Sequence, residues 1–161
     1  MVKVRKGFTL VELLIVIVII GILAAAMLLS STSATASAEA SSIVSELRGL
    51  KAAASMFYAD SMDVITAAST LSKTGHAAIT GYLAKYMDNP NKVRENTAFT
   101  FHSDSAQGKW YVGYQLNKVS PQVKEKLAGR AKTTGLYSSH ADTTSTNAYA
   151  GSTNEVWMVA R

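Results

Sequence analysis

One carboxylate, Glu12, lies near the start of the most apolar segment of this 161-residue chain. No charged or strongly polar side chain follows it from Leu13 to Leu29. A carboxylate at mid-membrane costs about 2.5–3.5 kcal/mol on insertion scales, and less near the end of a helix. Glu12 therefore calls for a partner, and an acid within a membrane span is by default a candidate functional residue.

The segment that carries Glu12 has the length of a membrane span. Phe8 to Leu29 would form a helix of about 33 Å at roughly 1.5 Å per residue, which matches a hydrocarbon core of about 30 Å. Lys3, Arg5 and Lys6 precede it without any acid, so the positive-inside rule predicts that this end stays in the cytoplasm.

Two simpler interpretations leave Glu12 without a role. The segment could be a plain membrane anchor, or a Sec signal peptide with Ala36-Ser37-Ala38 as an A-x-A cleavage site. That site would give a leader much longer than the usual length of about 15–30 residues. Neither an anchor nor a signal peptide has a use for an acid at this position.

The string KGFTLVELLIVIVIIGILAAA, from Lys6 to Ala26, resembles the class III leader and N-terminal helix of type IV pilins and the related secretion pseudopilins. The resemblance implies that a prepilin peptidase cuts between Gly7 and Phe8 and methylates the new N-terminus at Phe8. It also implies that Glu12 neutralises the N-terminal amine of a neighbouring copy during filament assembly. Pairing offsets much of the cost of burying either charge alone.

Thr9 and Gly21 also fit the family pattern, and we assign Thr9 to assembly together with Phe8 and Glu12. The chain departs from the pattern in two ways. Pilins commonly have a proline near the position of Leu29, and none stands here, so a proline kink is not expected. The C-terminal disulfide of many pilins is impossible, because the chain has no cysteine.

The helix is expected to continue beyond the membrane, because no proline occurs before Pro90. Ser30 to Ala38 is small and polar and would by itself predict a linker. After it, apolar side chains recur at spacings of four and three residues: Ile43, Leu47, Leu50, Ala54 and Phe57. We predict one helix over residues 8–59, on the order of 75 Å long, with its membrane or filament-core part at 8–29.

Residues 60–161 are predicted to form a β-rich head. Alternating apolar residues predict half-buried strands at 97–102 and 109–116, joined by a hairpin loop. Residues 156–160 predict a final strand, and Val64-Ile65 could pair briefly. Residues 138–154 are rich in Ser, Thr, Asn and Gly and predict a surface loop.

Short helices complete the predicted head. One is expected over residues 76–87, followed by a turn at 88–91. Another is expected to begin at Ser120-Pro121, an N-cap followed by proline at the first helical position, and to end near Ala128 with Gly129.

The pattern as a whole predicts an α+β fold of the pilin-like lollipop type. A long N-terminal helix, apolar in its first half and amphipathic in its second, packs on a small antiparallel sheet. The expected organisation is a cleaved leader at 1–7, the long helix at 8–59 and the globular head at 60–161.

We find no motif for catalysis or for cofactor binding. His76, His102 and His140 are far apart in the sequence, and GxSxG, P-loop and GxGxxG motifs are absent. Asp142 with Thr143, Ser145 and Asn147 offers oxygen ligands, but a calcium site normally takes six to eight oxygens and several carboxylates. We therefore expect no enzyme, no cofactor and no metal site.

The formal charge of +5 first suggests nucleic acid as a partner. Cleavage after Gly7 would remove three basic residues and leave 13 basic and 11 acidic ones, or +2. The remaining basic cluster comprises Lys118, Lys124, Lys126, Arg130 and Lys132. We interpret it as a solvated face, with an accessory role in DNA handling as the less favoured alternative.

The function implied by the resemblance is that of a structural subunit. The protein would sit in the inner membrane and be processed after Gly7. It would then polymerise through its N-terminal helix, with the pilus assembly machinery, into a surface filament for adhesion, motility or DNA uptake. The first alternative is a pseudopilin of a type II secretion or competence system. A soluble binding protein released by Sec cleavage is the second.

Overall fold

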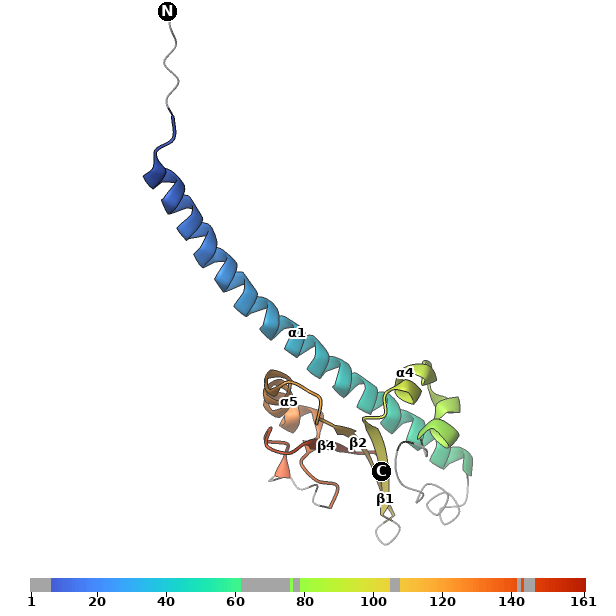
Figure 1. Cartoon of the computed structure of the whole chain (residues 1–161). Helices are drawn as coiled ribbons and strands as arrows, with labels where there is room; N and C mark the ends of the chain where they lie inside the picture. The colour runs from blue at the N-terminus through green and yellow to red at the C-terminus, as the bar shows by residue number, and fades with distance from the viewer. Residues whose placement is uncertain (1–6, 62–75, 77–78, 105–107, 142, 144–146) are drawn as a thin grey trace, which may run out of the picture. The chain divides into compact units, whose positions relative to one another are not determined.

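A computed structural model describes residues 7–61, 76, 79–104, 108–141, 143 and 147–161 (Figure 1). The chain divides after Thr35 into two parts, which are described separately below. The elements combine a long helix with a four-stranded antiparallel sheet and short helices. The predicted α+β fold is thus confirmed.

Helix α1 runs without interruption from Leu10 to Ser61, over 52 residues. It therefore passes straight through the small polar segment at 30–38, where a linker was the alternative. Hydroxyl side chains in and after this segment hydrogen-bond back to helix carbonyls, as Thr35 does to Thr32 (2.9 Å) and Ser41 to Ser37 (2.8 Å). These bonds satisfy the hydroxyls that would otherwise compete with the helix for backbone groups.

The sheet has the strand order β1-β2-β4-β3, and all of its neighbours are antiparallel. Its strands are β1 (Phe99–Asp104), β2 (Lys109–Gln115), β3 (Leu136–Tyr137) and β4 (Glu155–Val159). The predicted hairpin pairs Phe101 with Val112, and the predicted final strand lies inside the sheet between β2 and β3. The two-residue strand β3 was not foreseen.

The second part of α1 buries one face in the core of the head. Its buried stripe includes Ala40, Ile43, Leu47, Leu50 and Ala54, and Figure 1 shows the sheet and α5 gathered beside this part of the helix. The sheet contributes alternate residues to the same hydrophobic cluster: Phe99, Phe101, Trp110, Val112, Val156 and Met158. Alternation of this kind places one face of a sheet on the core, as the sequence pattern predicted.

The short helices differ from the prediction in kind and in extent. Instead of one helix over 76–87, a π-helical turn (η1, Ile79–Leu83) leads into a 3-10 turn (η2, Ala84–Tyr86). Where a turn was predicted at 88–91, helix α4 (Pro90–Glu95) begins with proline at its first position. Proline suits that position because its missing N–H would have no partner inside the helix.

Helix α5 (Pro121–Thr134) starts after Ser120 as predicted but runs past Gly129. Its buried residues Val123, Leu127 and Ala131 lie four apart, so the apolar face continues beyond the predicted end. Gly135, with φ 69°, closes the helix instead, because glycine adopts the left-handed conformation without steric cost. The expected pairing of Val64-Ile65 lies outside the described residues.

The predicted surface loop at 138–154 is fastened to the head at its second half. Tyr149 is buried, its backbone N–H donates to the carbonyl of Leu136 (2.9 Å), and its hydroxyl donates to the carbonyl of Thr153 (3.2 Å). Ala148 forms an isolated bridge with Tyr137. The packing of the Tyr149 ring therefore holds this part of the segment against the head, although most of the residues around it are polar.

The outer face of the sheet gives a first testable prediction. A Cβ atom at Gly113 would lie 2.6 Å from the Trp157 ring. Gly113→Ala should therefore lower the thermal unfolding midpoint of the full chain in detergent micelles, since overpacking typically costs about 1–3 kcal/mol. Gly129→Ala is the control: it meets nothing within 4 Å and should raise the midpoint, because Ala is favoured over Gly inside a helix by about 0.5–1 kcal/mol. Equal midpoints for the two variants would contradict this packing.

Candidate functional site

Thr9 and Glu12 form a hydrogen-bonded unit at the start of α1. The Glu12 carboxylate accepts from the backbone N–H of Thr9 (2.7 Å) and from its hydroxyl (2.8 Å), both at Oε2. In return the backbone N–H of Glu12 donates to the Thr9 hydroxyl oxygen at 3.2 Å. This is a capping box, in which the two residues satisfy backbone donors that the first turn of a helix leaves without partners.

The capping box was not foreseen, although its signal stood in the sequence. Threonine followed three residues later by glutamate, just before an apolar run, is the pattern that marks such a helix start. The family resemblance assigns Thr9 and Glu12 to filament assembly alone. The structure adds a local role for both: within one chain they fix where α1 begins.

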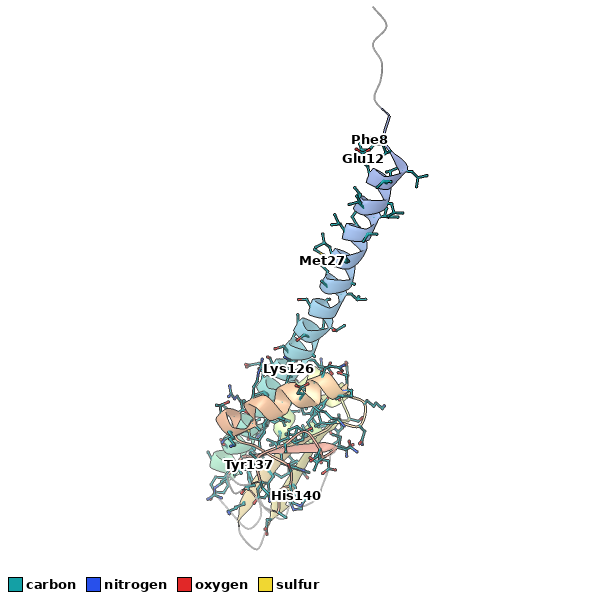
Figure 2. The ribbon with its side chains drawn as sticks, turned by 90° about the vertical axis from the view of Figure 1, so that its left-hand side faces the viewer. Phe8, Glu12, Met27, Lys126, Tyr137 and His140 are labelled. Carbon is teal, nitrogen blue, oxygen red and sulfur yellow. The ribbon has the colours of Figure 1, made fainter. Side chains whose placement is uncertain are left out.

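The first part of α1 exposes its apolar surface on all sides. Every side chain described between Gly7 and Thr35 is exposed, and Figure 2 shows side chains projecting all around the helix near Met27. An 18-residue window within α1 reaches a mean hydropathy of 3.1 with none of it buried. The helix therefore has the length and composition to cross a membrane, and its own chain does not cover it in the part that the structure describes.

The junction that the sequence marks for processing is accessible. Phe8 is 84% exposed and lies just before α1 (Figure 2), and Gly7 has open space around it. Neither residue is part of the helix. A protease needs an accessible substrate, and the exposed position of both residues is compatible with cleavage between them. The structure thus brings Phe8, Thr9 and Glu12 together at one end of the helix.

Two of the three histidines are brought together on the outer face of the sheet. The rings of His102 and His140 lie 4.0 Å apart, and His140 also packs edge-on against Trp157 at 4.9 Å. Burial, and then the neighbouring His140, lower the pKa of His102 below its ordinary value. His76 is elsewhere, with its Nδ1 at 3.2 Å from the carbonyl oxygen of Phe99.

No group of three or more His, Cys, Asp or Glu side chains that could hold a metal ion occurs among the described residues. Of the oxygen ligands considered for calcium, Asp142 and Ser145 lie outside those residues. Thr143 and Asn147 belong to the described part of the chain.

Two members of the basic cluster hold the head together. Arg130 of α5 donates to the hydroxyls of Ser37 (2.8 Å) and Ser41 on α1, one helical turn apart. Lys124 donates to the Asn154 side chain at 2.8 Å. Interpreting the whole cluster as a solvated face was therefore incomplete, because Arg130 links the last helix of the head to the long helix.

Comparison with known proteins identifies the N-terminal segment. Residues 2–28 match the family model described as "Prokaryotic N-terminal methylation motif". No curated protein and no solved structure matches the chain. The segment is thus a type IV pilin-like class III signal peptide, and the resemblance drawn from the sequence is confirmed over these residues.

The capping box predicts a measurable effect at the start of α1. Thr9→Val removes the hydroxyl that bonds Glu12 and should accelerate hydrogen exchange at the Glu12 amide in detergent micelles, since loss of an N-cap side chain costs about 1 kcal/mol. Thr9→Ser keeps the hydroxyl and should exchange like the unchanged protein. If both variants exchanged at the unchanged rate, the cap would not stabilise the helix start.

Proposed function

We propose that this protein is a pilin that is cut after Gly7, methylated at Phe8 and polymerised into a type IV pilus on the cell surface. One observation carries the proposal: the methylation motif covers the start of a helix whose apolar first part is exposed on every side. Apolar surface contributes roughly 25 cal/mol per Å² when it leaves water. A membrane covers this surface before assembly, and other copies of the same helix cover it afterwards.

The position of Glu12 supports pairing with a neighbouring copy. Its carboxylate sits at the N-terminal end of α1, where the helix dipole favours negative charge. A carboxylate has about four acceptor sites, so Glu12 can keep its bonds to Thr9 and also accept from the methylated amine of another Phe8. A copy displaced by a different distance along the filament axis would leave the Glu12 carboxylate and the Phe8 amine both unpaired. Two unpaired buried charges cost more free energy than a buried pair.

The proposed route begins in the inner membrane. Lys3, Arg5 and Lys6 would hold the leader on the cytoplasmic side, where a prepilin peptidase would find the Gly7–Phe8 bond. The assembly machinery would then move processed copies into the filament. The partners proposed are therefore the peptidase, the assembly machinery and further copies of this chain.

The Sec alternative is disfavoured by where its cleavage site lies. Ala36-Ser37-Ala38 is inside α1, Ala36 is buried in the core of the head, and Ser37 accepts a hydrogen bond from Arg130. Cleavage after Ala38 would remove these contacts from the released protein. The helix is continuous across the site, whereas a leader would be expected to separate from the domain that it exports.

Intact-mass analysis of the exported protein tests the processing step. We expect a chain that begins at Phe8 and carries one added methyl group. A chain that begins at Glu39 would establish Sec cleavage and refute the proposal, and a chain that retains Met1 to Gly7 would show that the motif is not processed.

Replacement of Glu12 tests the assembly step. Glu12→Ala should insert into the membrane as before, because it removes a charge from an apolar segment, but it should abolish or strongly slow filament formation. Sheared surface filaments, measured against the membrane pool, report the effect. Glu125→Ala, an exposed acid on α5, is the matched control. Undiminished filaments from Glu12→Ala would refute the pairing, and short periplasmic fibres in place of long extracellular ones would favour the pseudopilin alternative.

A further inference from the structure

The second part of α1 carries an acidic pair on one flank of its buried stripe. Glu39 and Glu46 are seven residues apart, about two helical turns, and so share one side of the helix. Together with Asn96 and Tyr114 they line a hollow of about 180 Å³. This flank adjoins β1 and β2, at one edge of the sheet.

A basic pair occupies the opposite flank. Arg48 and Lys51 are three residues apart, which places them on one side of the helix. They line a different hollow, of about 330 Å³, together with Gly135 and Tyr137. That hollow adjoins β3, the strand at the other edge of the sheet. Opposite charges therefore stand on the two sides of the stripe that packs on the head.

Three of the four charged side chains on these flanks are open to another molecule. Glu39, Arg48 and Lys51 are exposed, and no hydrogen bond or ion pair engages their side chains within the part of the chain that the structure describes. The helix face between the two flanks, turned away from the sheet, is built from small exposed residues: Ala38, Ser45, Gly49 and Ala52. Small side chains allow a second helix to come close.

We propose that the acidic flank of one copy contacts the basic flank of the next copy. This proposal rests on the proposed function and names the surface through which the subunits would meet beyond the membrane segment. The occupant is a second copy because the chain itself presents both complementary halves. A contact between two different surfaces of the same molecule is heterologous, and repetition of such a contact builds an open helical filament.

The spacing of the two pairs sets the displacement between copies. The centre of the acidic pair lies seven residues before the centre of the basic pair, or about 10 Å along the helix. The copy that offers its acidic flank must therefore be shifted by about this distance toward the C-terminal end of α1, relative to the copy that offers its basic flank. The direction depends on the order of the pairs, since a basic pair that preceded the acidic pair would require the opposite shift.

The proposed pairing at the N-terminus also sets a displacement between copies. Phe8 precedes Glu12 by four residues, so a neighbour whose amine reaches Glu12 is displaced by about 6 Å toward the C-terminal end, counted along the helix. One displaced copy can therefore offer its amine to Glu12 and its acidic flank to the basic flank of the same neighbour, and the two displacements are similar in size. The long side chains of Glu, Lys and Arg span the difference between the two values.

Charge reversal on a single flank tests the contact in cells that make the full chain. One variant carries Glu39→Lys with Glu46→Lys, a second carries Arg48→Glu with Lys51→Glu, and a third carries all four changes. Each of the first two should reduce sheared filaments roughly tenfold, because like charges would then face each other. The third should restore them, because the complementarity is re-established with the signs exchanged.

Matched controls and outcomes keep this test separate from the test of polymerisation. Lys109→Glu with Glu125→Lys changes exposed charges away from α1 and should leave the yield unchanged. If the unchanged chain forms filaments and a single-flank reversal assembles at full yield, the contact is wrong and the proposed function stands. If the variant with all four changes yields as few filaments as the single-flank variants, the flanks bind a different partner. The proposed contact is then likewise overturned. If the unchanged chain forms no filaments, both proposals fail.

Disulfide trapping gives a second measurement that does not depend on charge. The chain has no cysteine, so one protein with Glu39→Cys and Arg48→Cys has no competing thiols. The two positions are about 13.5 Å apart along their own helix, too far for a disulfide within one chain. Mild oxidation of filaments should produce a ladder of linked copies from the paired variant and none from either single variant. Monomer alone from the paired variant would overturn the contact.

Discussion

The structure depends on one constraint: the first part of α1 is apolar on every side, and the rest of its chain leaves it uncovered in the described residues. In water this helix would expose a long row of Leu, Ile and Val side chains. Two surroundings relieve that cost, a lipid bilayer and a bundle of identical helices. The methylation motif at residues 2–28 extends from the segment before the helix into its apolar first part. The proposed cleavage there would control passage from the first surrounding to the second.

Glu12 connects this constraint to the order of assembly. Within one chain it is part of a capping box with Thr9, which fixes the start of the helix and holds the carboxylate at its N-terminal end. In the proposed filament, the same placement would present the charge to an amine on a neighbouring copy. Apolar contact between two helices changes little when one helix slides along the other. A buried pair of charges, in contrast, forms at only one displacement between the copies. In the proposed contact, the charged flanks farther along α1 would favour a displacement of similar size.

The long helix, the β1–β2 hairpin and the C-terminal strand were predictable because each shows its own periodicity over at least five residues. Strand β3 was not, because two residues carry no period and Leu136 and Tyr137 pair only through the tertiary contact with β4. The end of α5 was misplaced because Gly129 resembles a helix terminator, while the buried position of Ala131 carries the helix on to Gly135. At the site, the apolar run and Glu12 were recognisable in the sequence. The capping box of Thr9 and Glu12 was also recognisable but was not predicted. The contact between His102 and His140 could not be predicted from the sequence, because it depends on the path of a loop across the sheet.

Electron cryomicroscopy of the assembled filament tests the central claim most directly, because it places α1 of one copy beside α1 of the next. The account predicts that the first part of α1 is buried among neighbouring copies. It also predicts that a carboxylate oxygen of Glu12 lies within about 4 Å of the Phe8 nitrogen of an adjacent subunit, the distance of an ion pair. A filament in which Glu12 bonds only to its own Thr9, while the apolar helices stay apart from one another, would contradict it.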